Sequence, residues 1–354
     1  MLSAVLGLCS LPYRGAVRAE ALSVGAVCAV LMCADSGEVL FEKNADQRCA
    51  IASITKIMTA VIALEEAAAN DREVVFDDSM TAEGSSMHLQ KGEILRLSEL
   101  VKGMMAVSGN DAANACAVAA AGSREAFAER MNVKARQLGM KNSHFVTPSG
   151  LDDEQHYSSA RDMALLCAYA MENERFREIV SQKRVTVNYV LPEGKTQVCV
   201  NHNKLLSLYE GCIGIKTGFT KKAGRTLTSC AERSGVRLIA VTLNDSNDWE
   251  DHRALLDYGF SLYEQQELIS GEERFELPVA GSEKESITVR AENACSPAVK
   301  KDGSDHLTYK LYMPPFCYAP IEKGRQVGEL CVWRNGRKIW QTRLLADEAA
   351  SYEE

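Results

Sequence analysis

The chain of 354 residues lacks the patterns by which several classes of protein are recognised. Its twelve cysteines include no C-x-x-C pair, and its six histidines form no H-E-x-x-H cluster. We therefore expect no metal site, no cofactor and no metallopeptidase chemistry. There is no dense run of Lys or Arg, and the net charge of -8 argues against a nucleic-acid partner. No later segment is long and apolar enough to span a bilayer, so no membrane anchor is predicted.

The first 21 residues are apolar in places but carry no basic residue ahead of their apolar run. Residues 4–11 form that run, and Ala19-Glu-Ala21 matches the A-x-A pattern of a signal-peptidase site. We interpret residues 1–21 as a signal peptide that is truncated or mis-started at its front. The protein is then expected to be exported, to an extracellular position or to the cell-wall or periplasmic face. The alternative is a leader that stays in the cytosol.

The hydrophobic pattern divides the remaining chain into two regions. Residues 22–268 open with a hairpin, continue through apolar helices, and return to alternating strands before a closing helix. This order predicts an α+β domain, an antiparallel sheet with helices packed on it. Residues 270–346 contain short strands between turn residues and predict a small all-β domain, followed by an acidic tail at 347–354. Most cysteines lie inside apolar runs, which indicates that they are small buried hydrophobic residues. The sequence also allows some of them to form disulfides.

Ser53 and Lys56 lie three residues apart at the head of an apolar run that reaches Ala69. On a helix, positions i and i+3 share a face, so the lysine amine can reach the serine hydroxyl. A serine needs such a neighbouring base to act as a nucleophile at neutral pH. Taken alone, the pair is more readily explained as a capping serine and a solvated lysine, because such a two-residue pattern recurs easily by chance.

Two further short motifs follow in the chain. Ser108-Gly109-Asn110 joins two apolar helices, where its hydroxyl and amide can point into a cleft. Lys216-Thr217-Gly218 lies on a predicted strand, and its glycine leaves room for a ligand backbone to lie alongside. S-x-x-K, S-x-N and K-T-G occur once each, in this order, on a helix, a helix junction and a strand. The three together are the motif set of penicillin-binding proteins and class A β-lactamases.

With these motifs the chain resembles the D-alanyl-D-alanine carboxypeptidases, the low-molecular-mass penicillin-binding proteins. The resemblance implies a transpeptidase-like fold shared with β-lactamases, followed by a small β-rich domain. Gly109, where β-lactamases typically carry Asp, favours the carboxypeptidase branch. Further segments that carry the resemblance are 50–59, 84–87, 107–112, 150–153, 156–162, 214–220, 223–224 and 319–324.

The resemblance also implies a mechanism and the residues for it. Ser53 would attack the bond between two D-alanines and form an acyl-enzyme that water hydrolyses, with Lys56 as base. Crowding by a second lysine and burial would lower the pKa of Lys56. The partners are then peptidoglycan stem peptides as substrate and β-lactams as covalent inhibitors. The implied catalytic residues are Ser53, Lys56, Ser108 as proton relay and Asn110; the implied substrate-binding residues are Lys216, Thr217, Gly218 and Phe219, with backbone N–H groups of Ser53 and Phe219 as oxyanion hole.

Three other functions stay open at this point. A β-lactamase would deacylate the same adduct quickly, a transpeptidase would pass the acyl group to a peptide amine, and a scaffold would bind wall without turnover. His202 stands where many relatives carry an arginine, and we leave it between a ligand role and a surface histidine. The segment 84–87 is equally well a loop beside the site and a plain turn.

Overall fold

The computed structural model describes residues 22–352. The predicted signal peptide at 1–21 lies outside the described residues, as do the last two residues. The contacts divide the described chain into two compact units, which meet in sequence at Phe260 and Ser261. Among the residues described, no helix is long and apolar enough to cross a membrane.

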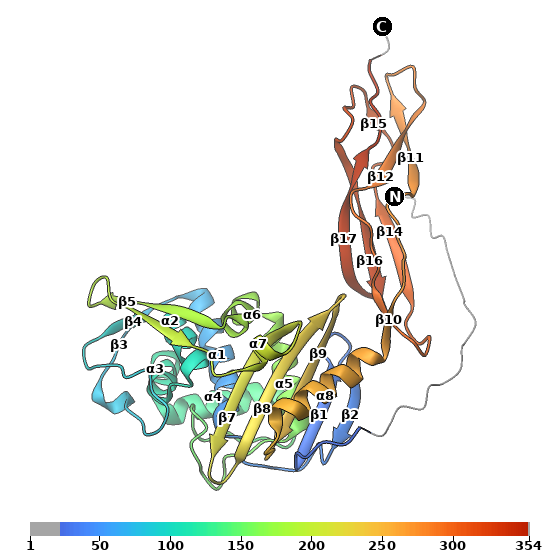
Figure 1. The fold of residues 1–354 in the computed structure, drawn as a ribbon. Coiled ribbons are helices and arrows are strands. Elements are labelled where there is room, and N and C mark those ends of the chain that lie inside the picture. The colour runs from blue at the N-terminus through green and yellow to red at the C-terminus, as the bar shows by residue number, and fades with distance from the viewer. Residues whose placement is uncertain (1–21, 353–354) are drawn as a thin grey trace. The chain divides into compact units, whose positions relative to one another are not determined.

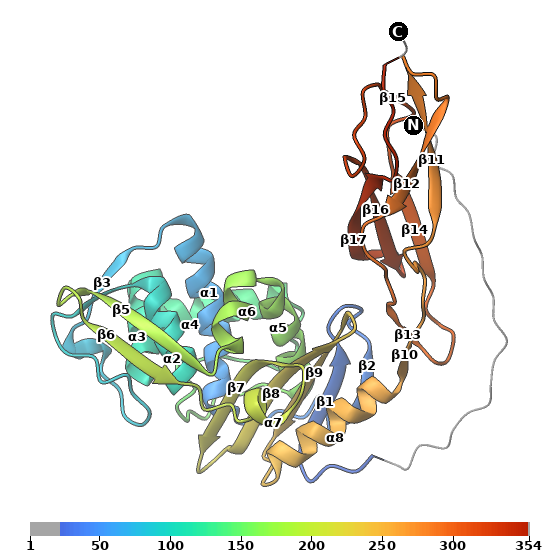
Figure 2. The same cartoon turned by 45° about the horizontal axis from the view of Figure 1, so that its top comes forward.

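The first unit is built on a five-stranded antiparallel sheet with the order β2-β1-β9-β8-β7 (Figure 1). Buried side chains run almost without interruption along β8 and β9, because helices cover both faces of the sheet. Helix α5 packs on β1 and β9, whereas α8 lies on the other face, where Gly259 lets it approach Leu31 and Leu238 (Figure 2). The strands are β1 (Cys28–Cys33), β2 (Val39–Lys43), β7 (Cys212–Thr220), β8 (Gly224–Arg233) and β9 (Val236–Leu243).

A helical region and a second sheet complete this unit. The second sheet has the order β3-β4-β5-β6, and β5 alternates buried and exposed residues because one of its faces is open to water. Ser123 and Ser159 cap α4 and α5, because each side chain accepts a backbone N–H from the first turn of its helix. The elements are η1 (Ala52–Thr55), α1 (Lys56–Ala69), β3 (Glu73–Val75), η2 (Asp78–Met80), β4 (Ile94–Arg96), α2 (Leu97–Val107), α3 (Asn110–Ala121), α4 (Arg124–Gln137), α5 (Ala160–Glu172), α6 (Glu174–Ser181), β5 (Arg184–Leu191), β6 (Thr196–Val200), α7 (Leu205–Leu208) and α8 (Asp248–Ser261).

The second unit is all β, with a six-stranded sheet of order β14-β16-β17-β12-β11-β15 and a two-stranded sheet of β10 and β13. Its core is a separate apolar cluster that includes Leu330, Val332 and Leu344. The fold is therefore the predicted α+β domain with helices on an antiparallel sheet, followed by a small all-β domain. The strands are β10 (Tyr263–Gln265), β11 (Arg274–Ala280), β12 (Ser286–Ala291), β13 (Ala298–Lys300), β14 (Leu307–Tyr312), β15 (Cys317–Tyr318), β16 (Gln326–Arg334) and β17 (Arg337–Ala346).

The structure differs from the sequence-based boundaries at both ends of this unit. The closing helix α8 ends at Ser261, and the residues after it pair with β13 instead of extending the helix. The segment predicted as an acidic tail from residue 347 enters the β-unit, since Ala350 is buried and its backbone pairs with that of Ile321. Glu348 forms an ion pair with Lys284 there.

Candidate active site

Ser53 lies in a short 3-10 turn, η1, and Lys56 is the first residue of the α-helix that follows. The N-cap of η1 is Ile51 and that of α1 is Thr55, so the capping interpretation of Ser53 does not apply. The Lys56 Nζ instead lies 2.9 Å from Ser53 Oγ. Ala52, just before the serine, holds a left-handed backbone with φ of 50°, an unfavourable conformation for alanine. Such local strain is typical of functional sites.

Lys56 is fully buried and has three hydrogen-bond partners. Its Nζ donates to Asn110 Oδ1 and to the Ser149 carbonyl oxygen, at 2.7 Å each, in addition to the contact with Ser53. The amide oxygen and the carbonyl can only accept hydrogen bonds. In a neutral amine they therefore take the two N–H groups, and the lone pair faces the Ser53 hydroxyl. Burial lowers the pKa of Lys56 well below its usual value, and the charge of Lys216 lowers it further, while Asp111 opposes the shift.

Asn110 is held so that its oxygen faces the lysine. Its Nδ2 donates to the Glu83 carbonyl at 2.6 Å, and its backbone N–H donates to the Ser85 carbonyl at 2.7 Å. The amide nitrogen is thereby directed away from Lys56, which fixes the orientation of the amide group. Ser108 ends α2 with a left-handed φ of 63°, and this bend separates α2 from α3.

The K-T-G motif lies on β7, the edge strand of the large sheet. Successive side chains alternate, so Lys216 is buried under the strand while Thr217 and Phe219 face outward, with Phe219 exposed. Burial lowers the pKa of Lys216 to about 7, and its Nζ donates to the Thr217 carbonyl at 2.9 Å. A Cβ added at Gly218 would lie 2.9 Å from the Ser53 backbone nitrogen. Glycine here lets β7 approach Ser53.

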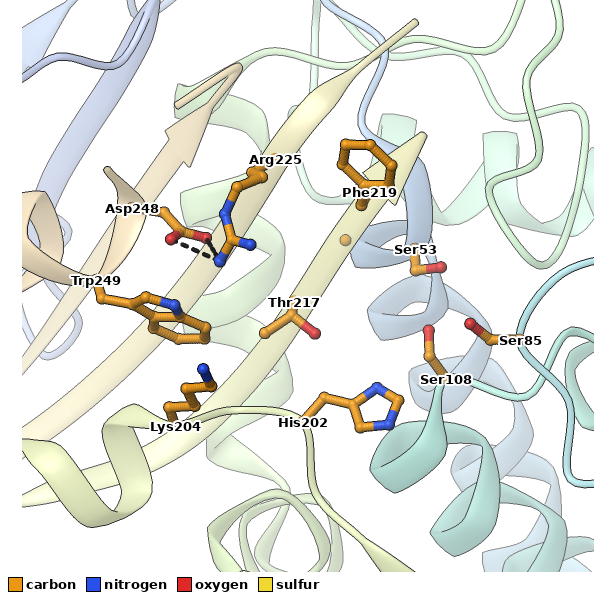
Figure 3. A pocket seen from close by; sticks show the side chains of 11 residues that line it. Ser53, Ser85, Ser108, His202, Lys204, Thr217, Phe219, Arg225, Asp248 and Trp249 are labelled. Carbon is orange, nitrogen blue, oxygen red and sulfur yellow. Dashed lines mark hydrogen bonds and ion pairs between the residues drawn. The ribbon is translucent and has the colours of Figure 1, made fainter. Parts of the chain in front are cut away.

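A cavity of about 320 Å³ joins these elements. Figure 3 shows the hydroxyl groups of Ser53 and Ser108 on one side, Trp249 on the other and Thr217 between them. Of the eight site residues predicted from sequence, Lys56, Asn110 and Lys216 do not line the cavity but lie buried behind its wall. The lining residues are Ser53, Ser85, Ser108, His202, Lys204, Thr217, Gly218, Phe219, Arg225, Asp248 and Trp249.

Several residues of the cavity were not predicted from the sequence. Arg225 donates from Nη2 to both carboxylate oxygens of Asp248, at 2.8 and 2.9 Å, and stacks against Trp249. His202, left open between two roles, also lines the cavity, and burial lowers its pKa. Arg225 lies on β8, Asp248 and Trp249 begin α8, and His202 lies between β6 and α7, and no short motif links these three segments. Between residues 22 and 352, no three His, Cys, Asp or Glu side chains are grouped to hold a metal ion.

Asp111, next to Asn110 at the start of α3, fastens the 84–89 segment to the site. Its carboxylate accepts hydrogen bonds from the Met87 and Leu89 backbone N–H groups and from the Ser86 hydroxyl, which lies at 2.6 Å. The same segment supplies the Ser85 carbonyl that accepts the Asn110 N–H. Residues 84–87 are therefore a loop beside the site, one of the two interpretations that the sequence allowed.

His156 supports the site from behind α1. Its Nδ1 accepts the backbone N–H groups of Val146 and Thr147, so its Nε2 carries the proton and donates to Thr55 Oγ1 at 2.9 Å. Burial lowers the pKa of His156 to about 4, which keeps the ring neutral at neutral pH. The histidine thus ties the 146–150 turn, with the Ser149 carbonyl, to the helix that carries Lys56.

Comparisons with known proteins agree with this geometry. A family model described as D-alanyl-D-alanine carboxypeptidase matches residues 15–247, and a model described as penicillin-binding protein 5, C-terminal domain, matches residues 263–351. The chain belongs to the D-alanyl-D-alanine carboxypeptidase family. It is 33% identical over 343 residues to D-alanyl-D-alanine carboxypeptidase DacF of Bacillus subtilis, covering 94% of this chain and 87% of that protein.

Two solved structures show that the fold of this chain is also similar to that of known family members. The D-alanyl-D-alanine carboxypeptidase DacD of Francisella tularensis matches with a TM-score of 0.67 and 27% identity, over 97% of this chain and 98% of that one. A DD-transpeptidase of a Streptomyces strain matches with a TM-score of 0.65 and 32% identity, over 68% of this chain and 98% of that one. The protein is therefore a carboxypeptidase-family hydrolase of the penicillin-binding-protein type.

Proposed function

We propose that this protein removes the terminal D-alanine from peptidoglycan pentapeptide stems through an acyl-enzyme on Ser53, and that β-lactams acylate the same serine. The observation that carries the proposal is the hydrogen bonding of Lys56. Asn110 and Ser149 occupy its N–H groups, burial and Lys216 favour its neutral form, and Ser53 is the remaining partner. A neutral amine in that position is a general base for the serine.

The other wall of the cleft suits a carboxylate-terminated peptide. Thr217 presents a hydroxyl, and Lys216, just behind it, gains a positive charge most readily when an anion is bound nearby. The backbone N–H of Ser53 lies against Gly218, and we assign the oxyanion hole to it together with the N–H of Phe219. Ser108, whose hydroxyl points toward Ser53 in Figure 3, would return the proton to the leaving amine.

The test is covalent labelling by a penicillin, read by mass spectrometry of the intact protein and its peptides. We expect one acyl group per molecule, located on Ser53. The Ser53→Ala variant should lose this acyl group, and it should also lose the release of D-alanine from a D-Ala-D-Ala-terminated pentapeptide. The activity should fall at least about 10⁴-fold. Ser85→Ala removes another hydroxyl from the same cavity and should leave the acyl group on Ser53. An acyl group that persists in Ser53→Ala would refute the proposal.

The lifetime of the penicillin adduct separates the carboxypeptidase from a β-lactamase. Asp248, the carboxylate that lines the cavity, is buried and held by Arg225, so it is not free to activate a deacylating water. We therefore expect the adduct to persist for minutes or longer. Adding an amino-acid acceptor and finding no condensed product distinguishes hydrolysis from transpeptidation, the activity in the name of the Streptomyces relative.

Export follows from the proposed substrate, which lies outside the cytoplasm, and from the Ala19-Glu-Ala21 pattern. The same mass measurement on protein from cell envelopes should show a mature N-terminus directly after Ala21. An N-terminus at Met1 in the mature protein would contradict the predicted cleavage.

A further inference from the structure

Two cysteines in the catalytic unit bring their thiols into contact. The Sγ atoms of Cys28 and Cys49 lie 3.4 Å apart in a hydrogen bond. Cys28 begins β1 and is fully buried, whereas Cys49 is half-buried and precedes Ser53 by four residues. In the part of the chain that the structure describes, no other two thiols are hydrogen-bonded to each other.

The backbone on both sides holds the two sulfurs together. Cys28 pairs with Leu243 across β1 and β9. Cys49 forms a separate β-bridge with Ser158, with hydrogen bonds of 2.8 and 3.0 Å in the two directions. A disulfide needs an S–S distance of about 2.05 Å, so the sulfurs must approach by a little more than 1 Å. Rotation of the half-buried Cys49 side chain can supply such a movement without breaking either backbone pairing.

We propose that Cys28 and Cys49 form a disulfide when the protein meets a small disulfide oxidant of the glutathione class. The Cys49 thiolate attacks one sulfur of the oxidant, forms a mixed disulfide and releases one glutathione thiolate. The Cys28 thiol then loses its proton to solvent and attacks the Cys49 sulfur, which releases the second glutathione. The two protein thiols give up two electrons and two protons, and the oxidant takes them as two thiols. The bond fastens the segment before Ser53 to β1.

The two thiols differ in pKa, and the difference is in the direction that these steps require. The hydrogen bond from Cys28 lowers the pKa of Cys49 to about 7, so the accessible sulfur is a thiolate in a large fraction of molecules at neutral pH. The same hydrogen bond, with burial, raises the pKa of Cys28. Cys116, by comparison, has no thiol neighbour in hydrogen-bond contact, and burial raises its pKa above the usual value. The attacking group is therefore Cys49 and the resolving group is Cys28.

The experiment treats the full-length protein with an excess of glutathione disulfide and maps the peptides without reduction. We expect one linked peptide pair containing Cys28 and Cys49, lighter than the reduced pair by two hydrogen atoms. The oxidised protein should melt roughly 5–10 °C above the reduced one, because the bond closes a short loop in the unfolded chain. Both the linked peptides and the rise in Tm should disappear on adding dithiothreitol.

Variants decide between this pairing and general thiol oxidation. Cys49→Ser and Cys28→Ser should each lose the linked peptides and the rise in Tm while keeping penicillin labelling of Ser53. Cys317→Ser is the matched control, because Cys317 is also half-buried but has no thiol neighbour, and it should keep both signals. Stable glutathionylation of Cys49 with Cys28 still reduced, or a linked pair made of other cysteines, would overturn the proposal.

Discussion

The two units of this protein bury polar groups to very different extents. In residues 22–260 the buried set includes two lysines, Lys56 and Lys216, with Asn110 and Asp111 beside them. In residues 261–352 the buried polar or charged side chains are Arg334 and Thr342. Burial of an amine is costly unless it becomes neutral or is paired. The first unit bears that cost at the candidate site, where burial lowers the pKa of Lys56 and of Lys216.

The backbone shows the same contrast. In residues 22–260 the non-glycine residues at positive φ include Ala52, next to Ser53, and Ser108, between α2 and α3; the others are Asn44, His88, Ser234 and Asn244. In the β-unit the described non-glycine residue with positive φ is Asn335, in the turn between β16 and β17, and asparagine tolerates this conformation. Positive φ at non-glycine residues is therefore more frequent in the first unit but is not confined to the site, and the β-unit relies on an apolar core with its ion pairs at the surface.

Among substitutions that test this difference between the two units, we expect the largest effect on acylation at Lys56. Lys56→Arg keeps a long cation, but a guanidinium cannot become neutral in a protein. We expect the rate of penicillin acylation to fall at least about 10³-fold, measured as a second-order rate constant with a fluorescent penicillin. Lys102→Arg, at a partly exposed lysine paired with Glu99, should change the rate little. An acylation rate within tenfold of the parent would contradict the role of Lys56 as base.

A pair of glycines tests whether close packing matters more in the site than in the β-unit. A Cβ at Gly218 would lie 2.5 Å from Thr226 Oγ1, and a Cβ at Gly328 would lie 2.5 Å from the Tyr312 carbonyl. We expect Gly218→Ala to slow acylation about 10²-fold because β7 must move away from Ser53. Gly328→Ala should lower the stability of the β-unit and leave acylation unchanged. Equal losses of acylation in both variants would show that the effect is not local.

A smaller effect is expected at Asp111, which joins the 84–89 loop to α3. Asp111→Asn loses a negative charge and cannot accept all the hydrogen bonds of the carboxylate, so we expect a cost of about 1–3 kcal/mol in unfolding free energy and roughly tenfold slower acylation. Since Asp111 raises the pKa of Lys56, the variant's pH–rate profile should also shift to lower pH. Glu292→Gln in the β-unit removes the partner of the exposed Arg343 and serves as control, with little effect expected. A pH–rate profile shifted to higher pH would contradict the assigned coupling.

The smallest effect concerns pH and Lys216. Its pKa is about 7 when folded and near 10.4 in an unfolded chain, so between these values the unfolded state binds more protons. Stability from this group therefore rises with pH, by up to about 2 kcal/mol between pH 7 and pH 9. The unfolding free energy of Lys216→Met should depend less on pH over this range, as measured by denaturant unfolding at pH 7 and at pH 9. An unchanged pH dependence in the variant would argue against a buried Lys216 of low pKa.

The residue types of the site were predictable because their motifs are short and local. S-x-x-K places Ser53 and Lys56 on one face even though the turn is 3-10 at the serine, and helix caps at Ser123 and Ser159 follow from sequence. Short strands such as β10 and β13 were missed, because three-residue strands carry too little periodicity. Trp249 lines the cavity, and no motif in the sequence marks it as a site residue.

The sequence by itself determined the fold class, the two-part order of the chain and the eight candidate residues. The tertiary structure alone decided which groups surround Lys56 and lower its pKa. Its partners Asn110 and Ser149 are 54 and 93 positions away in the chain, and the second contact is to a backbone carbonyl, which no residue type identifies. Burial and the distance to Lys216 likewise depend on how the helices and β7 pack. The residue types of the site can be recognised from short local motifs, but their pKa values depend on contacts between segments that are distant in the chain.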